Sequence, residues 1–460
     1  MAHRAWAIVV SLSAGCFSEA DNADDEGGDE GETTASASLT GEPSTGVSSS
    51  VDGTASSDDG SGSSEGATGP SDGSGSGSSG GSDTGADSGS TGGEGACAAM
   101  GDAHCGDQIS VPGEQCWGPA QPENAGGDPL GRAAIADFDD DGHADIATID
   151  GDDGVWVYPG SSTGLDPATV LTESAGTGMW SIDAGDLNAD GLADLAIGGF
   201  DPQVWIFYGN GAGALATTTE PIDVGLGAET VRIVDLQGDG APELLVAGEF
   251  DDASDGAWVT VLEDQDGAWV GGAADFQIPG TASVVDMRPL VDPDLAAPGL
   301  VVILADGTLS FAPPDDTFVP DFSTVTTVTP GAYRLELGDL DDDGVPDVAL
   351  AGRGTVTAVV YDTFAQTLAV GSVLGTTNLR DMGVAIGDVD RDGDADLVVS
   401  DVGFQRIQVY PQQNGKIGAP TPIVLSEAPQ GVALAHVVGD CLFDIVALGT
   451  STVVLVPADP

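Results

Sequence analysis

The stretch DFDDDGHAD at residues 137–145 has aspartate at its first, third, fifth and ninth positions and glycine at its sixth. The pattern returns as DLNADGLAD at 186–194, DLDDDGVPD at 339–347 and DVDRDGDAD at 388–396. The first two copies start 49 residues apart, at 137 and 186, and so do the last two, at 339 and 388. A fixed period of this length indicates a repeat protein in which each repeat forms one supersecondary unit.

Three weaker units occupy the remaining sequence. Residues 235–243, DLQGDGAPE, keep most of the pattern. A unit placed at Asp286 keeps only its flanking strands, and a last unit starts at His436, where Val438 and Cys441 replace a ligand and the turn glycine. We therefore predict seven units of 48 to 53 residues, starting at residues 137, 186, 235, 286, 339, 388 and 436.

Each unit contains short apolar runs around its acidic loop. One run precedes the loop, as at 133–136, one follows it, as at 194–197, and a third carries aromatic residues, as at 204–208. The runs are short, rich in β-branched residues and bounded by turn residues, so they are predicted to be strands. With a looser fourth strand, each unit is typical of a propeller blade, and the fold class is all-β, a seven-bladed β-propeller.

The two ends of the propeller are expected to meet in one blade. The sequence stops soon after the third strand of the last unit, at 452–456, which leaves that blade without its outer strand. The segment 114–119 precedes the first unit and is placed to supply it. Closure of this kind removes a free sheet edge.

The first sixteen residues resemble a bacterial export signal. A basic start at 1–4 and an apolar run at 5–12 lead to Ser13-Ala14-Gly15-Cys16, which is similar to a lipobox with Ser13 in the usual place of leucine. Residues 1–16 are thus predicted to be a signal peptide, with Cys16 acylated as a membrane anchor. Simple secretion is the alternative, and both readings predict an exported protein at the outer membrane, at the cell surface or outside the cell.

Residues 17–96 are predicted to be a disordered acidic tether. They contain no Lys or Arg and, after Phe17, no aromatic residue. Low hydrophobicity and charge of one sign leave the entropy of ordering unopposed. The predicted organisation is the signal peptide, this tether, a cysteine-containing segment with the closing strand at 97–120, and the propeller at 121–460.

The cysteine count agrees with export. Removing the candidate lipid acceptor Cys16 leaves four, which allow three disulfide connectivities. Because the closing strand and the last unit share a blade, Cys116 with Cys441 is one predicted pair, leaving Cys97 with Cys105. The spacings include no zinc-type CxxC pair.

Charge excludes one class of partner and favours another. The chain has 10 Lys and Arg against 76 Asp and Glu, a formal net charge of -66. Nucleic acid would be repelled by this surplus. Cations that neutralise part of it would relieve repulsion in the folded state, so the composition favours metal binding.

The repeats resemble FG-GAP/VCBS repeats, the blades of integrin α-subunit propellers and of many bacterial surface proteins. The resemblance covers about residues 110–460 and implies a calcium ion in each complete loop, held by side chains at positions 1, 3, 5 and 9 and a backbone carbonyl at position 7. The chemistry agrees, because Ca²⁺ prefers six to eight hard oxygens in loose geometry and Mg²⁺ demands a strict octahedron. An EF-hand is excluded because its twelfth-position Glu is absent.

About four calcium sites are predicted, and the loop at 235–243 is a fifth candidate; the units at Asp286 and His436 are expected to bind nothing. The predicted ligands are Asp137, Asp139, Asp141, Asp145; Asp186, Asn188, Asp190, Asp194; Asp235, Asp239, Glu243; Asp339, Asp341, Asp343, Asp347; and Asp388, Asp390, Asp392, Asp396.

The predicted function is a non-catalytic, monomeric surface scaffold that mediates adhesion or binds an extracellular protein or glycan through propeller loops. The alternatives are a carbohydrate-binding lectin and, less favoured, a polysaccharide-degrading enzyme. Paired carboxylates are abundant, but their spacing is explained by metal binding, so they are poor evidence for glycosidase chemistry. Tryptophans in or near the strands, such as Trp156, Trp180, Trp205 and Trp258, suit packing between blades better than sugar stacking, and Trp180 fits that explanation least.

Overall fold

A computed structural model of the chain describes residues 115–458. Within that range it leaves out 125–128, 151–153, 173–177, 211–214, 218–220, 237–240, 250–255, 266–267, 281, 292–297, 314–321, 323, 328–331, 353, 363–365, 376–380 and 439–441. The predicted signal peptide, the acylation of Cys16, the tether 17–96 and residues 97–114 of the cysteine-containing segment lie outside the described residues and stay predictions.

In most blades the second strand is an apolar run that is buried along its whole length. This holds for β3 (Asp145–Asp150), β7 (Asp194–Gly199), β16 (Gly299–Leu304), β20 (Asp347–Gly352) and β24 (Asp396–Asp401). A short continuous apolar run between turn residues forms such a strand when both faces of its sheet are covered. Each blade is therefore packed between two neighbours.

The first two blades are antiparallel sheets with strands in sequence order. Blade 1 consists of β2 (Pro129–Ala136), β3, β4 (Val155–Tyr158) and β5 (Thr169–Thr172). Blade 2 consists of β6 (Met179–Gly185), β7, β8 (Gln203–Tyr208) and two short strands that both pair with β8, β9 (Ala216–Thr217) and β10 (Ile222–Asp223).

Blades 3 and 4 follow the same order. Blade 3 consists of β11 (Thr230–Val234), β12 (Glu243–Glu249), β13 (Ala257–Gln265) and β14 (Ala268–Gln277). Blade 4 consists of β15 (Val284–Leu290), β16, β17 (Thr308–Ala312) and β18 (Thr324–Thr327).

Blades 5 and 6 repeat it again. Blade 5 consists of β19 (Ala332–Gly338), β20, β21 (Thr355–Asp362) and β22 (Thr367–Gly375). Blade 6 consists of β23 (Asp381–Gly387), β24, β25 (Arg406–Tyr410) and β26 (Thr421–Val424), with the single 3-10 turn η1 (Val402–Phe404) between β24 and β25.

The seventh blade joins the two ends of the described chain. β27 (Gly431–Ala435), β28 (Asp444–Leu448) and β29 (Thr452–Val456) are completed by β1 (Gln121–Asn124), which pairs antiparallel with β29. The predicted closure is confirmed, but the closing strand lies at 121–124 and not at 114–119. In the described part of the earlier segment, Trp117 forms an isolated bridge with Ala458 and packs against the apolar cluster of blades 6 and 7.

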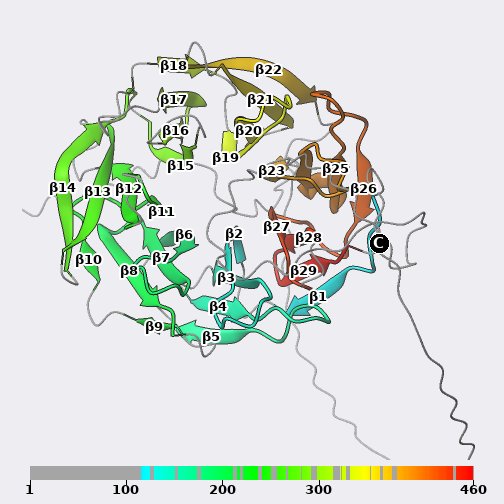
Figure 1. Cartoon of the computed structure of the whole chain (residues 1–460), viewed down its shortest axis with the longest axis horizontal. Helices are drawn as coiled ribbons and strands as arrows, with labels where there is room; N and C mark the ends of the chain where they lie inside the picture. Colours follow the sequence, from blue (N-terminus) through cyan, green and yellow to red (C-terminus); the bar gives the residue numbers. More distant parts are fainter. Residues whose placement is uncertain are drawn as a thin grey trace, which may run out of the picture. The chain divides into compact units, whose positions relative to one another are not determined.

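The described strands thus form seven blades in a ring (Figure 1). The innermost strand of each blade contacts that of the next, from β2 through β6, β11, β15, β19 and β23 to β27, and β27 contacts β2. Seven apolar clusters lie between successive blades, for example Ile149 of blade 1 with Ile182 and Phe207 of blade 2. Burial between blades is what stabilises the ring.

One predicted unit boundary is wrong. The residue that ends the innermost strand pairs with the loop's ninth residue, as Ala136 does with Asp145, and in blade 4 the corresponding pair is Leu290 with Gly299. The unit therefore starts at Val291 and not at Asp286, which lies inside β15. The carboxylate of Asp286 forms a buried ion pair with Arg232 and does not belong to a loop.

Cys116 is buried and disulfide-bonded. The other four cysteines lie outside the described residues, so the predicted pairing with Cys441, and that of Cys97 with Cys105, stay predictions.

Candidate metal centres

The four complete acidic loops share one backbone conformation. Each connects the innermost strand of its blade to the second strand. The fourth residue is left-handed, with φ of 61° at Asp140 and 58° at Arg391, and so is the sixth, where glycine avoids the strain. A backbone that turns twice in this way wraps around a central point.

The first aspartate of each loop holds the turn from inside. Asp137 accepts hydrogen bonds from the backbone N–H groups of Asp141 at 3.1 Å and Gly142 at 2.8 Å. Asp186 and Asp339 make the same pair of contacts four and five residues on, and Asp388 accepts from Gly393 at 3.1 Å. The loop conformation is thus held by protein contacts.

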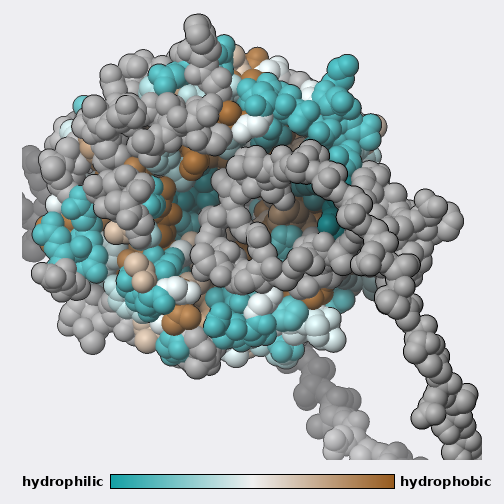
Figure 2. Space-filling view, viewed as in Figure 1, coloured by the Kyte–Doolittle hydropathy of each residue, from teal (hydrophilic) through white to brown (hydrophobic). Residues whose placement is uncertain are grey.

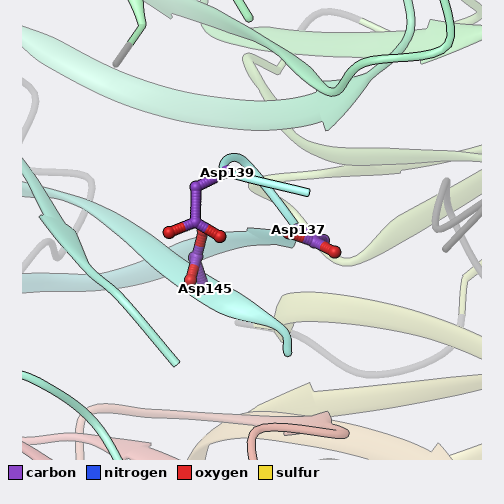
Figure 3. Close-up of side chains that lie close together, drawn as sticks. All are labelled: Asp137, Asp139 and Asp145. Carbon is purple, nitrogen blue, oxygen red and sulfur yellow. The ribbon is translucent and has the colours of Figure 1, made fainter. Parts of the chain in front are cut away.

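Three loops bring the first, third and ninth carboxylates together. In each group one oxygen per residue lies within 4.8 Å of the others. Figure 3 shows the three side chains of the blade 1 group. The groups are Asp137, Asp139 and Asp145; Asp339, Asp341 and Asp347; and Asp388, Asp390 and Asp396. In blade 2 the third position is Asn188, whose side-chain oxygen accepts the N–H of Asp190 at 2.9 Å, so that site offers an amide oxygen in place of one carboxylate.

The fifth aspartate of each loop accepts a backbone hydrogen bond of its own. Asp141, Asp190, Asp343 and Asp392 are absent from the close groups among the described residues. Each accepts the backbone N–H two residues further on, at 2.9 to 3.0 Å. Its Oδ1 therefore caps the second half of the turn.

The ninth carboxylate has a structural role that the repeat pattern alone did not reveal. In blade 1, Asp145 accepts N–H groups from Phe138 at 2.9 Å and Gly160 at 2.7 Å, which ties the loop to the end of the third strand. Asp194, Asp347, Asp396 and Asp444 repeat both contacts in their own blades, at 2.8 to 3.1 Å. The sequence signal for this role is that blade 7 keeps the ninth aspartate, Asp444, although its loop lacks the first and third acidic residues.

Electrostatics at the three close groups favour a bound cation. Oδ1 of Asp139 and Oδ1 of Asp388 are buried without a hydrogen-bond donor among the described residues. Burial raises the pKa of Asp145 and Asp347 to about 7 and of Asp396 to about 8, despite hydrogen bonds from the backbone, and neighbouring aspartates add to the shift. Carboxylates that repel one another and lack donors are the oxygens a hard cation would satisfy, so the residues fit calcium.

The loop of blade 3 is only partly described. Asp235 and the buried Glu243 lie within it, and Glu243 accepts the N–H of Leu236 at 2.8 Å, like the ninth carboxylates elsewhere. Asp239 lies outside the described residues, so the fifth candidate site stays a prediction.

In blade 7 the loop begins with His436 in place of the first aspartate. Nδ1 of His436 lies 2.8 Å from the carbonyl oxygen of Leu442, and its ring stacks on Phe443 at 4.4 Å between centroids. These contacts hold the turn by packing.

Two of the four tryptophans named in the sequence analysis pack between blades. Trp156 and Trp205 lie against the apolar clusters at the blade interfaces. Trp180 instead stacks on Phe200, with centroids 6.1 Å apart, and Phe200 is 61% exposed. No helix among the described residues is long and apolar enough to cross a membrane.

Comparison with known proteins identifies the repeats. A family described as "FG-GAP-like repeat" matches residues 137–197, 186–246 and 339–399. A search of curated proteins returned no match.

Solved structures share the architecture at low sequence identity. The crystal structure of BBS1N in complex with ARL6DN, soaked with mercury, is 13% identical with a TM-score of 0.53, and the match covers 75% of this chain and 97% of that one. The crystal structure of Chaetomium thermophilum Raptor is also 13% identical, with a TM-score of 0.50 over 75% of this chain and 29% of that chain. At this identity the likeness concerns the fold alone. The repeat matches and the ring of blades together identify the chain as a seven-bladed β-propeller with FG-GAP-like repeats.

Proposed function

We propose that this chain is an exported, non-catalytic scaffold whose propeller is stabilised by calcium and whose surface binds an extracellular protein or glycan. The observation that supports it most directly is the same acidic group in three blades, held by the same backbone contacts. Ligand binding or an adhesion-type role is what an FG-GAP propeller suggests.

Calcium is the favoured ion because every candidate ligand is an oxygen. Carboxylates, an amide oxygen in blade 2 and solvent suit Ca²⁺, and no Cys or His belongs to the three groups among the described residues. Sites of this kind in extracellular proteins bind with Kd of about 10⁻⁴ to 10⁻³ M, which suits an exported protein. Binding to the folded state alone contributes directly to stability.

A structural role for these carboxylates leaves little support for hydrolysis. Glycosidases need a free acid and base on either side of a substrate, whereas the ninth carboxylates here are occupied by backbone N–H groups. Of the described histidines, His143 lies 3.0 Å from the carbonyl oxygen of Val437 and His436 is held in its own loop. The FG-GAP-like repeat match agrees with a binding scaffold.

The surface suits a polar partner more than a large apolar one. In Figure 2 the coloured residues form a mixed surface, with hydrophilic groups around much of the rim and smaller hydrophobic groups between them. Large exposed apolar side chains in the described part of the chain are spread over several blades: Phe200 lies in blade 2, whereas Phe404 and Val424 lie in blade 6. Scattered apolar residues are ordinary for a protein surface and do not indicate a hydrophobic docking site.

Calcium stoichiometry tests the proposal. Calorimetric titration of the full chain with CaCl₂ is expected to give about four sites. Asp139→Ala should remove one of them, while Asp306→Ala, which alters a turn aspartate outside the close groups, should remove none. Absence of calcium binding, or equal stoichiometry in both variants and the parent, would refute the metal role.

Export and anchoring have their own test. Fatty-acid labelling of the chain in a bacterium with lipoprotein processing should modify the parent and not Cys16→Ala. If both variants stay unlabelled and reach the medium, the chain is secreted without an anchor; if both stay in the cytoplasm, the proposal of export is wrong.

A further inference from the structure

Arginine is concentrated on the innermost strands of this acidic protein. The chain has only 10 Lys and Arg in total, yet Arg132 lies on β2, Arg232 on β11, Arg288 on β15 and Arg334 on β19. Arg132 and Arg232 are 7% and 4% exposed. Four of the few cations are therefore gathered around the middle of the ring.

Two of these side chains reach across the ring. Arg132 of blade 1 donates from Nη2 to the carbonyl oxygen of Val285 in blade 4 at 2.7 Å. Arg334 of blade 5 donates from Nη2 to the carbonyl oxygen of Gly131 in blade 1 at 3.3 Å. Neither pair of blades is adjacent (Figure 1), so the guanidinium groups lie in the space enclosed by the innermost strands.

Carboxylates balance two of the arginines. Arg232 forms a buried ion pair with Asp286, and Arg288 pairs with Glu336 at 3.2 Å. Burial alone would raise the pKa of Asp286, but the nearby arginines Arg232, Arg288 and Arg132 hold it at about 2. Asp286 is thus a fixed negative charge of this cluster, and not the degenerate loop residue that its sequence position suggested.

Arg132 has no such partner. Its Nε is buried without an acceptor, and no carboxylate among the described residues lies within ion-pair distance. Its remaining contact is with the ring of Trp180, 5.2 Å from the guanidinium carbon. Burial and the neighbouring arginines, Arg334 first, lower its pKa well below the ordinary value.

A buried guanidinium surrounded by like charge is costly unless an anion accompanies it. The charged side chains described here on the innermost strands are the four arginines and the carboxylates of Asp183, Asp286 and Glu336. None of these three carboxylates lies within ion-pair distance of Arg132, although the whole chain has a net charge of -66.

Blades 6 and 7 carry small residues at the equivalent positions, whereas blade 2, on the other side of blade 1, carries Ser181 and Asp183 there. Four residues before the end of the innermost strand, where blade 1 has Arg132, blade 6 has Gly383 and blade 7 has Gly431. Two residues before the end, these blades have Ala385 and Ala433. No side chain longer than a methyl group comes from these four positions beside Arg132.

We propose that an oxyanion group of a ligand, a carboxylate, sulfate or phosphate, binds in the centre of the ring against Arg132, next to Arg334. A guanidinium is suited to this because its planar fork donates two parallel hydrogen bonds to such a group. The inference goes beyond the proposed metal role, since these residues lie on the innermost strands and not on the acidic loops.

Anion titration of the full chain tests it. Calorimetry and thermal unfolding with sodium sulfate, and separately with sodium acetate, are compared with sodium chloride at equal ionic strength and 1 mM CaCl₂. Sulfate also stabilises proteins by general exclusion from their surface, so the comparison between variants carries the result. The stronger of the two anions indicates which group the natural ligand carries.

Two methionine substitutions distinguish specific binding from a general salt effect. Arg132→Met keeps the apolar stem and is expected to weaken binding of the preferred anion at least tenfold. Arg406→Met removes a cation that pairs with Asp401 in blade 6 and should leave binding unchanged. Equal anion affinity in the parent and Arg132→Met, or no anion binding by the parent, overturns the proposal.

A further variant covers the case in which Arg132→Met does not fold. Arg132→Lys keeps the charge and loses the planar fork, so it should bind the anion several-fold more weakly than the parent. Affinity equal to that of the parent would again overturn the proposal. Because the calcium concentration is the same in all titrations, failure here leaves the calcium stoichiometry experiment unaffected.

Discussion

The ninth carboxylate of each loop is expected to contribute to stability in two separable ways. Asp396 accepts N–H groups from Val389 at 3.1 Å and Gln412 at 2.8 Å and also belongs to a close acidic group. Asp444 makes the equivalent two hydrogen bonds, at 3.0 and 2.9 Å, in a blade that lacks the first and third acidic ligands. Asp444→Asn is therefore a matched control for Asp396→Asn.

The expected magnitudes follow from these contacts. An asparagine offers one acceptor where the carboxylate offers two, so each variant leaves one N–H unsatisfied, at a cost of about 1 to 3 kcal/mol. For Asp396→Asn a calcium-dependent cost is added. With 10 mM calcium and a Kd of about 10⁻⁴ to 10⁻³ M, the lost site is worth about 1.4 to 2.7 kcal/mol.

The assay is urea unfolding of the parent and both variants at pH 7, in 10 mM CaCl₂ and in EDTA. Asp396→Asn should be destabilised more in calcium than in EDTA, by the amount given above. Asp444→Asn should be destabilised equally in both. Equal calcium dependence of the two variants would show that the acidic group in blade 6 binds no calcium and that Asp396 acts only through its hydrogen bonds.

Three further predictions concern parts of the propeller away from the loops. Asp286→Ala leaves the buried Arg232 unpaired and should cost about 3 to 5 kcal/mol in urea unfolding, and a cost below 1 kcal/mol would contradict the ion pair. Burial raises the pKa of Glu229 to about 7, so ionisation of this carboxyl group opposes folding once the pH rises above the ordinary pKa of glutamate. Glu229→Gln should therefore stabilise the protein by on the order of 2 kcal/mol at pH 8 and by less at pH 4. A larger stabilisation at pH 4 than at pH 8 would refute the shift. A methyl group on Gly248 would lie 1.7 Å from a backbone oxygen, so Gly248→Ala should destabilise the protein by at least about 2 kcal/mol. A methyl group on Gly271 would have no atom within 4 Å, so Gly271→Ala should change stability by less than about 0.5 kcal/mol. Equal effects of the two substitutions would contradict the close blade packing.

The repeated loops made the fold predictable because their acidic residues recur at a fixed period. Loop positions also predicted which residues end the innermost strand and begin the second one, as Ala136 and Asp145 do. Where the loop is lost, in blade 4, the sequence offers no landmark, and the boundary was placed at Asp286 instead of Val291. The closing strand was misplaced for a related reason, since the register of β1 against β29 depends on ladder geometry that no local motif encodes.

The residue types of the candidate site were predictable from the sequence, but the separate hydrogen-bonding roles of the individual aspartates were not. The spacing identified Asp137, Asp139 and Asp145 as neighbours, which the close group confirms. It did not indicate that Asp141 accepts a hydrogen bond from the backbone N–H of His143. The arginine cluster was missed altogether, because Arg132 is brought near Arg334 only by the curvature of the ring.

The central claim is that the acidic groups bind calcium and thereby stabilise the propeller. The most direct measurement is thermal unfolding of the full chain in 10 mM CaCl₂, in 10 mM MgCl₂ and in EDTA. The account predicts a midpoint that is clearly highest in calcium, with magnesium much less effective. Midpoints that are equal in calcium and in EDTA would contradict it and would leave the acidic loops as solvated turns.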